Sequence, residues 1–363
     1  MAIHQQMSDR PDPITHSSQP RYTPELAVWE LTLKCNMRCI HCGSSAGSAR
    51  SRELDVEECL VVADELIELG CRQMTFIGGE VFLFPGWERV ARRLSDGGVA
   101  VNIITNGFLM GDQEISQIRH AGLANVGISI DGLEENHNRI RQNDRSFSRA
   151  ITAIRHLRNE GFKVGVVTSL LDFNVSDLEG MYERFLKEGV GLWQLQIATC
   201  MGNLENFDEL LLKPGQVPEI TRFIAEKCRE ERIRVYAGDD IGYFNEHEPW
   251  LRNSPRGKSS WQGCQAGLRV VGIGSGGEVK GCESLYADRF VEGNLRSETL
   301  RKIWEKKGNF AYNRQFEPGM LVGGCAGCDR GSICRGGCRG ACYFTSGSLF
   351  DNRYCCYPEK RTR

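Results

Sequence analysis

The sequence predicts an α/β protein built on a parallel sheet, and two observations support this fold class. Between residues 27 and 236, short β-rich runs alternate six times with amphipathic helical runs, a pattern that implies parallel βαβ units. Polar residues and glycines follow the strand runs, at the edge of a parallel sheet where ligands bind. Six such units can form either an open doubly wound sheet or a partial barrel.

The predicted elements can be placed along the chain in order. The strand runs are residues 27–33, 73–79, 100–107, 125–132, 163–171 and 192–198. The helical runs are residues 56–69, 86–95, 113–121, 147–159, 176–187 and 216–229, with Asp55 a candidate N-cap of the first. The informative polar residues come where strands end: Cys35, then Gly78, Gly79 and Glu80, then Asn106, then Ser129 and Asp131.

Composition and charge exclude several classes of protein. The chain has 363 residues, 40% of them hydrophobic and 25% charged, as in a globular protein with a large core. A net charge of −2 gives no broad basic field for nucleic acid. No apolar run is long enough to span a membrane, and the polar N-terminus lacks the apolar stretch of a signal peptide. We therefore expect a cytoplasmic protein with a loose arm at residues 1–26.

The chain contains sixteen cysteines, which cluster at metal-ligand spacings. With no export signal, clustered thiolates indicate metal binding rather than disulfides. Cys35, Cys39 and Cys42 form a C-x3-C-x2-C run just after the first predicted strand. Three thiolates can hold three irons of a cubane and leave the fourth open, as in a catalytic site. The alternative is a zinc knuckle that borrows His41, although zinc pairs favour C-x2-C spacing.

This run, the Gly-Gly-Glu of residues 78–80 and the Ser-Ile-Asp-Gly of residues 129–132 together resemble the radical S-adenosylmethionine (SAM) enzymes. The resemblance covers residues 27–236 and implies a partial (β/α)6 TIM-like barrel. It implies that SAM occupies the open iron and is cleaved to a 5′-deoxyadenosyl radical that abstracts a hydrogen atom from the substrate. Two positions depart from the usual pattern: His41 stands where the family has an aromatic residue, and Val81 where it often has proline.

The same resemblance implies roles for the residues at the strand ends. Gly78, Gly79 and Glu80 would hold the SAM ammonium group. Ser129 and Arg141 resemble residues that contact its carboxylate, although a solvated charge is the alternative for Arg141. Asn106 and Asp131 would meet ribose or methionine polar groups, or serve as turn residues. An imidazole at His41 can stack near adenine.

The C-terminal region, residues 258–363, follows a linker at residues 237–257 and has a different texture. It carries nine cysteines and weak periodicity, apart from a short helix near residues 298–306. Its pattern resembles the SPASM domain, which carries two auxiliary 4Fe–4S clusters; two zinc sites are the alternative. The implied ligands are Cys325, Cys328, Cys334 and Cys355 for one cluster, with Cys356 the rival of Cys355. Those implied for the other are Cys264, Cys282 and Cys338, completed by Cys342 or left open toward substrate.

Two further residues are candidate catalytic groups. Glu283 follows a predicted cluster ligand, where some SPASM enzymes place a proton acceptor. Cys200 follows the sixth strand, although a core or loop cysteine is the simpler interpretation. Cys59, Cys71 and Cys228 are interpreted as buried small hydrophobes.

The two resemblances imply an enzyme that matures ribosomally made peptides and installs a C–C, ether or thioether cross-link. Auxiliary clusters would remove the second electron that such a bond releases. The alternatives are a sulfatase-maturase-like oxidation of Ser or Cys, epimerisation or excision, and a non-enzymatic electron carrier with several clusters. Expected cofactors are three 4Fe–4S clusters and SAM. Expected partners are a precursor peptide, a separate peptide-recognition protein and a flavodoxin- or ferredoxin-like reductant, with neither nucleic acid nor membrane.

Overall fold

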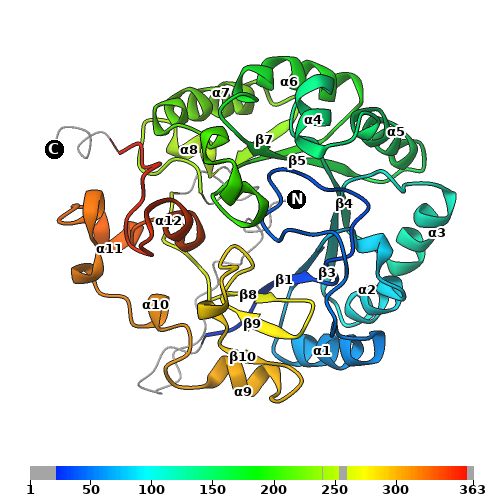
Figure 1. Cartoon of the computed structure of the whole chain (residues 1–363), viewed down its shortest axis with the longest axis horizontal. Helices are drawn as coiled ribbons and strands as arrows, with labels where there is room; N and C mark the ends of the chain where they lie inside the picture. Colours follow the sequence, from blue (N-terminus) through cyan, green and yellow to red (C-terminus); the bar gives the residue numbers. More distant parts are fainter. Residues whose placement is uncertain (1–21, 239, 253–259, 358–363) are drawn as a thin grey trace.

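The computed structural model describes residues 22–238, 240–252 and 260–357. A ten-stranded sheet forms the centre, in the order β10-β9-β8-β1-β2-β3-β4-β5-β6-β7, and helices lie around its outside (Figure 1). The pairs from β1 to β7 are all parallel, which confirms the α/β fold class with a parallel sheet. Most of the expected N-terminal arm and part of the expected linker lie outside the described residues.

The strands of the parallel part are β1 Leu26–Glu30, β2 Gln73–Ile77, β3 Ala100–Thr105, β4 Asn125–Ser129, β5 Val164–Leu170, β6 Leu192–Ile197 and β7 Arg234–Ala237. The helices that cover them are α1 Val56–Glu68, α2 Trp87–Asp96, α3 Asp112–Ala121, α4 Glu134–Arg141, α5 Ser146–Asn159, α6 Leu178–Lys187 and α7 Val217–Glu230. Asp55 caps α1 through bonds to the backbone N–H groups of Glu57 and Glu58. The six expected strands are therefore present, and β7 and α4 are additions.

Both faces of the sheet are covered. All five residues of β1 are buried, because helices pack on one face and the interior of the curved sheet lies on the other. The outer layer is held by large apolar side chains such as Trp29, Phe76, Trp87 and Trp193, each at most 1% exposed. Burying such a side chain stabilises the fold by about 1.5–3 kcal/mol. The interior face instead carries the polar residues that form the candidate site.

The C-terminal region joins the same sheet rather than standing apart. Strand β8 (Val270–Ile273) pairs in parallel with β1, and β9 (Glu278–Lys280) and β10 (Gly293–Asn294) continue the sheet antiparallel. Short helices follow: α9 Leu300–Glu305, α10 Ala311–Arg314, α11 Gly331–Cys334 and α12 Arg339–Ser346; α8 (Glu248–Leu251) precedes this region (Figure 1). No helix in the described ranges is long and apolar enough to cross a membrane.

Candidate functional site

A cavity of about 790 Å³ opens at the carboxyl ends of the parallel strands. The thiol-bearing residues Cys35, Cys39 and Cys42 line it on one side, and Cys264, Cys282 and Cys338 line it on another. The sequence places these two sets more than two hundred residues apart. The pairing of β8 with β1 brings them to one space, because the loop after β1 and the segments around β8 then share an edge.

The loop of Cys35, Cys39 and Cys42 is held by its own backbone. The Met37 N–H donates to Cys35 Sγ at 3.4 Å, and the Ala46 N–H donates to Cys42 Sγ at 3.3 Å. Arg141 Nη1 lies 3.9 Å from Cys39 Sγ. Backbone N–H groups and a guanidinium directed at sulfur suit thiolates rather than thiols, because both favour negative charge.

The loop that follows β6 packs directly on this cysteine loop. Asn203 donates from its backbone N–H to Cys42 O at 3.0 Å and from Nδ2 to Cys39 O at 2.9 Å. Gly202 has a φ of +62°, and a Cβ there would lie 2.4 Å from Gly43 O. The close approach therefore requires glycine at position 202. No local motif predicts this contact, because it joins loops about 160 residues apart.

The Gly-Gly-Glu turn after β2 divides into two parts. Gly78 and Gly79 line the cavity, as does Asn106. Glu80 is buried beneath the turn, where Oε1 accepts from Thr105 Oγ1 at 2.7 Å and Oε2 accepts from the Asn106 N–H at 3.0 Å. Burial raises the pKa of Glu80. Both of its oxygens thus support the end of β3, and the glycine backbone faces the cavity.

Asp131 is the centre of a buried polar cluster after β4. Its Oδ2 lies 2.6 Å from Arg141 Nη2 and 3.2 Å from His41 Nε2, and its Oδ1 accepts from the Ser169 N–H at 3.0 Å. The side chain of Arg141, at the end of α4, is only 11% exposed. Arg141 is therefore not the solvated surface charge that was the alternative interpretation. His41 Nδ1 is buried and has no partner among the described residues, and it lines the cavity beside Asp131. Ser129 also lines the cavity.

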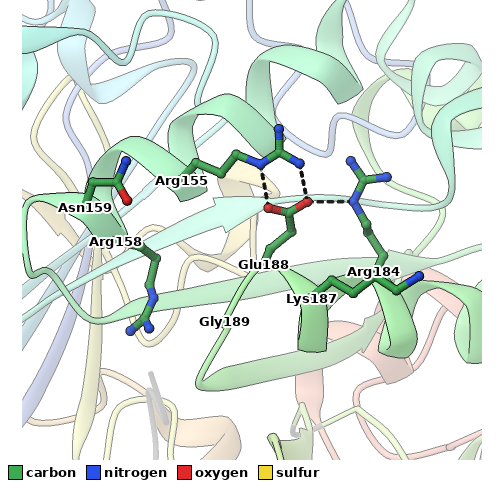
Figure 2. A pocket seen from close by; sticks show the side chains of 7 residues that line it. All are labelled: Arg155, Arg158, Asn159, Arg184, Lys187, Glu188 and Gly189. Atoms are coloured by element: carbon green, nitrogen blue, oxygen red, sulfur yellow. Dashed lines mark hydrogen bonds and ion pairs between the residues drawn. The ribbon is translucent and has the colours of Figure 1, made fainter.

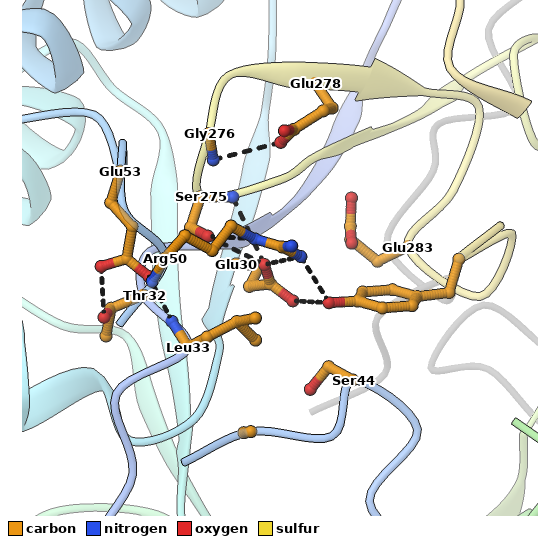
Figure 3. Close-up of polar contacts among 12 residues, drawn as sticks. Glu30, Thr32, Leu33, Ser44, Arg50, Glu53, Ser275, Gly276, Glu278 and Glu283 are labelled. Atoms are coloured by element: carbon orange, nitrogen blue, oxygen red, sulfur yellow. Dashed lines mark hydrogen bonds and ion pairs between the residues drawn. The ribbon is translucent and has the colours of Figure 1, made fainter. Parts of the chain in front are cut away.

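A second polar cluster joins β1 to the β8–β9 region (Figure 3). Arg50 Nη2 donates to the Tyr286 hydroxyl at 2.6 Å and pairs with Glu30 Oε1 at 3.3 Å, and Tyr286 donates to Glu30 Oε2 at 3.0 Å. Ser275 Oγ donates to the same carboxylate at 3.1 Å. Glu30, Tyr286 and Glu283 all line the cavity. Sequence reasoning did not find Glu30, Arg50 or Tyr286, because no local motif marks them.

Glu283 lies beside Cys282 at the cavity wall and is 6% exposed. Lys280 Nζ contacts its Oε2 at 2.9 Å, whereas its Oε1 has no partner among the described residues. Burial raises the pKa of Glu283 to about 7, against the opposing effect of Lys280. Cys200 behaves differently: Thr199 and Met201 line the cavity, but Cys200 is not among the residues that do.

The remaining cysteines of the C-terminal region separate by environment. Cys325, Cys328, Cys334 and Cys355 together line one small pocket. Cys356 instead packs in the main hydrophobic core and lies outside the residues that line this pocket. Cys342 is fully buried, and its S–H donates to Gly336 O at 3.0 Å; it lines neither the cavity nor the small pocket.

No three His, Cys, Asp or Glu side chains of the described residues converge tightly enough to hold one metal ion. A cubane binds each thiolate through a different iron, so its ligands need not meet at one point. The three sets of thiols, two around the cavity and one around the small pocket, therefore suit clusters better than single ions.

Another surface hollow, of about 700 Å³, lies on the outer helix layer between the ends of α5 and α6 (Figure 2). Glu188 accepts from Arg155 at 2.7 Å and from Arg184 Nε at 2.9 Å. Arg158 and Lys187 add positive charge beside it. Arg155, Arg158 and Lys187 are exposed, whereas the Glu188 side chain is 6% exposed. The hollow shares no lining residue with the cavity at the strand ends.

Residues 29–185 match the radical SAM superfamily, and residues 264–329 match the SPASM iron–sulfur cluster-binding domain. The chain belongs to the radical SAM/SPASM enzymes. This confirms the family expected from the cysteine spacing and from the Gly-Gly-Glu and Ser-Ile-Asp-Gly segments.

Two curated relatives of this radical SAM/SPASM enzyme have different names. The AdoMet-dependent heme synthase of Methanosarcina barkeri is 28% identical over 350 residues, covering 93% of this chain and 98% of the relative. The mycofactocin maturase MftC of Mycolicibacterium smegmatis is 27% identical over 326 residues, covering 89% of this chain and 80% of the relative.

Solved structures share the fold. Streptococcus suis SuiB bound to S-adenosylmethionine superposes with a TM-score of 0.72 at 12% identity, covering 92% of this chain and 76% of SuiB. The structure of anSMEcpe with bound AdoMet and Kp18Cys peptide superposes with a TM-score of 0.70 at 18% identity, covering 93% of this chain and 94% of anSMEcpe. SuiB has also been solved with its precursor peptide SuiA. At these identities the likeness establishes the fold alone.

Proposed function

We propose that this enzyme matures a ribosomally made peptide by radical chemistry and installs an oxidative cross-link, a C–C, ether or thioether bond. The observation that carries the proposal is the cavity itself. Thiols of both cysteine sets face it, and a row of amide-bearing side chains crosses it. A substrate held there would lie between the site of hydrogen abstraction and a group able to accept an electron.

The row of amides runs across β5, β6 and β7. Tyr236 donates its hydroxyl to Gln194 Oε1 at 2.7 Å, Gln194 Nε2 donates to Gln196 Oε1 at 3.2 Å, and Gln196 Nε2 donates to Ser169 Oγ at 3.2 Å. All four side chains line the cavity. Each glutamine amide has a second N–H, and its oxygen a second lone pair, so the row can also pair with a peptide backbone. This supports a peptide substrate.

The residues present fit the cofactors of the family. The thiols of Cys35, Cys39 and Cys42 would hold the SAM-binding cluster, with Gly78, Gly79, Asn106, Ser129, Asp131, Arg141 and His41 around SAM. The orphaned His41 Nδ1 supports this assignment, because a buried imidazole nitrogen without a partner is costly unless a ligand satisfies it. Glu80 would act by holding the turn. When bound, cluster and SAM supply the radical that abstracts a hydrogen atom.

The auxiliary clusters complete the cofactor set. Cys325, Cys328, Cys334 and Cys355 would hold one, which their common pocket supports. Cys264, Cys282 and Cys338 would hold the other, with its fourth position toward the cavity, because Cys342 points its thiol elsewhere. The whole enzyme would then contain about twelve irons in three 4Fe–4S clusters.

Glu283 would accept the proton that leaves the substrate when the new bond forms. Its free Oε1 at the cavity wall supports this role. We place the enzyme in the reducing cytoplasm, because thiols stay reduced there and remain able to bind iron. It also includes a flavodoxin- or ferredoxin-like reductant and a separate protein that recognises the precursor's leader.

The test uses anaerobically reconstituted enzyme and a deuterated precursor peptide. Deuterium should appear in 5′-deoxyadenosine, and the peptide should lose two hydrogen atoms, one as the abstracted deuterium and one as a proton. Glu283→Gln should keep SAM cleavage but lower the cross-linked product about 10²-fold or more. Glu292→Gln, a partly buried carboxylate that does not line the cavity, is the matched control and should keep both. Purification with zinc and little iron would overturn the whole assignment.

A second candidate is the oxidation of a porphyrin precursor, favoured by the nearly full-length match to the heme synthase. The cavity is less suited to a polycarboxylate, because three of the four arginines that line it are already paired with carboxylates of the protein. Arg141 pairs with Asp131, Arg269 with Glu25 and Arg252 with Glu248. Incubation with iron coproporphyrin III in place of peptide separates the two: product heme would displace the peptide proposal.

A further inference from the structure

Arg339 is a fully buried arginine next to a predicted cluster ligand. It follows Cys338 directly, begins α12, and lines the cavity although its side chain is 0% exposed. Every acceptor of its guanidinium among the described residues is a neutral oxygen. The acceptors are Asn313 Oδ1 at 3.0 Å, Leu349 O at 3.0 Å, Tyr312 O at 3.4 Å and Arg335 O.

No carboxylate of the described residues forms an ion pair with Arg339. The other arginines that line the cavity differ in this respect: Arg141 pairs with Asp131, for example. Arginine stays protonated in proteins, so the charge cannot be removed by loss of a proton. A buried charge without an opposite charge is destabilising even when it is hydrogen-bonded. A chain that keeps such a charge needs an anion nearby.

Thiols of the same cavity can supply that negative charge. Cys338 directly precedes Arg339 in the chain, and Cys264 and Cys282 line the cavity with it. Cys342 donates its S–H to Gly336 O, whereas Cys264 and Cys338 line the cavity. A thiolate that ligates metal is deprotonated, so these two cysteines become anionic when iron binds.

The surroundings strengthen the interaction. Arg339 lies 4.5 Å from the centroid of the Phe350 ring and 5.4 Å from that of Phe316. Aromatic rings exclude water and lower the local dielectric, in which a charge–charge interaction is several times stronger than in water. Asn313, which accepts from Arg339, also donates to Ala266 O at 2.7 Å and so ties the guanidinium to the Cys264 segment.

We propose that Arg339 is a positioning residue that supplies the counter-charge of the metal site formed by Cys264, Cys282 and Cys338. This rests on the proposed function, in which these three cysteines hold an iron–sulfur cluster. The positive charge favours deprotonated ligands and the reduced cluster, so removing it weakens iron retention and makes the reduction potential more negative.

The experiment compares Arg339→Met and Arg339→Lys in the full-length reconstituted enzyme. Arg314→Met is the matched control, because Arg314 also donates to carbonyls, those of Gly267 at 2.8 Å and Trp304 at 2.6 Å, and also lies against aromatic rings. Arg314 does not line the cavity. The measurements are iron release to a chelator, the cluster potential from a titration followed by electron paramagnetic resonance, and the rise in Tm when iron is loaded.

Arg339→Met should release about four irons some 10-fold to 100-fold faster than the wild type, shift one cluster to a more negative potential, and gain less Tm on iron loading. Arg339→Lys should restore the potential in part, since it keeps the charge. Arg314→Met should lower the Tm with and without iron alike, with no change in potential. If all three variants lower the Tm but leave iron release and the cluster potential unchanged, Arg339 only stabilises the fold and the proposal is wrong. Absence of iron from this site in the wild type would refute the proposed function instead.

Discussion

Replacing Gly202 by alanine should separate the β6 loop from the loop of Cys35, Cys39 and Cys42. Gly202 has a φ of +62°, and an added Cβ would lie 2.4 Å from Gly43 O and 2.5 Å from Cys42 O. Both are backbone atoms, so neither can rotate away. Relief of the clash requires one loop to move from the other.

The magnitude follows from two independent costs. A left-handed conformation costs a non-glycine residue about 1–2 kcal/mol. Overpacking against rigid atoms adds about 1–3 kcal/mol. Gly202→Ala should therefore lower the free energy of unfolding by about 2–5 kcal/mol, or move the loop and lose the two Asn203 hydrogen bonds to Cys39 O and Cys42 O. In either case the cysteine loop loses its support.

Urea unfolding of the iron-free protein measures the first effect, and iron content with SAM cleavage measures the second. Gly161→Ala is the matched control: its φ is +81°, but an added Cβ would meet nothing within 4 Å. The control should show the conformational cost alone, about 1–2 kcal/mol, and keep its iron. If Gly202→Ala matches Gly161→Ala in stability and in iron content, the close approach of the two loops does not support the site.

Two more predictions can be checked directly. Burial lowers the pKa of His137 to about 3, so the folded state binds fewer protons than the unfolded state and stability falls as the pH drops below about 6.5. Between pH 6.5 and pH 5 the free energy of unfolding of the wild type should fall by about 2 kcal/mol, and that of His137→Gln should not show this fall. His120 is exposed, so His120→Gln is the control and should follow the wild type. Urea titrations at each pH measure the difference. Cys342→Ser should leave the iron content and the resonance signals unchanged, whereas Cys338→Ser should remove or weaken one cluster; loss of a cluster in Cys342→Ser would restore Cys342 as a ligand.

The sheet could be predicted from sequence because its strands are buried on both faces and read as nearly continuous apolar runs. The two additions were missed for opposite reasons. Helix α4 has a strongly polar sequence, Glu134–Arg141, and buries only His137 and Ile140. Strand β7 has only four residues, too few for a periodic pattern. Both depend on their neighbours in the fold rather than on their own sequence.

The candidate site was predictable where its signal is local. The cysteine runs place several candidate ligands within a few residues, so spacing alone points to metal. The other contacts of the site are not local. Arg50 meets Tyr286 across 236 residues, and Asn203 meets Cys39 across 164. No propensity or spacing rule connects such positions, because only the pairing of β8 with β1 and the folding of the β6 loop bring them together.

The choice among neighbouring cysteines shows how environment decides what spacing leaves open. Cys355 and Cys356 are adjacent, yet the first lines the pocket of Cys325, Cys328 and Cys334 and the second packs in the core. Cys342 lies one helical turn after Cys338, but its S–H already has an acceptor in Gly336 O, and it does not line the cavity. We infer that the fourth position beside Cys264, Cys282 and Cys338 is completed from the cavity, where the proposed substrate would bind, and not by Cys342.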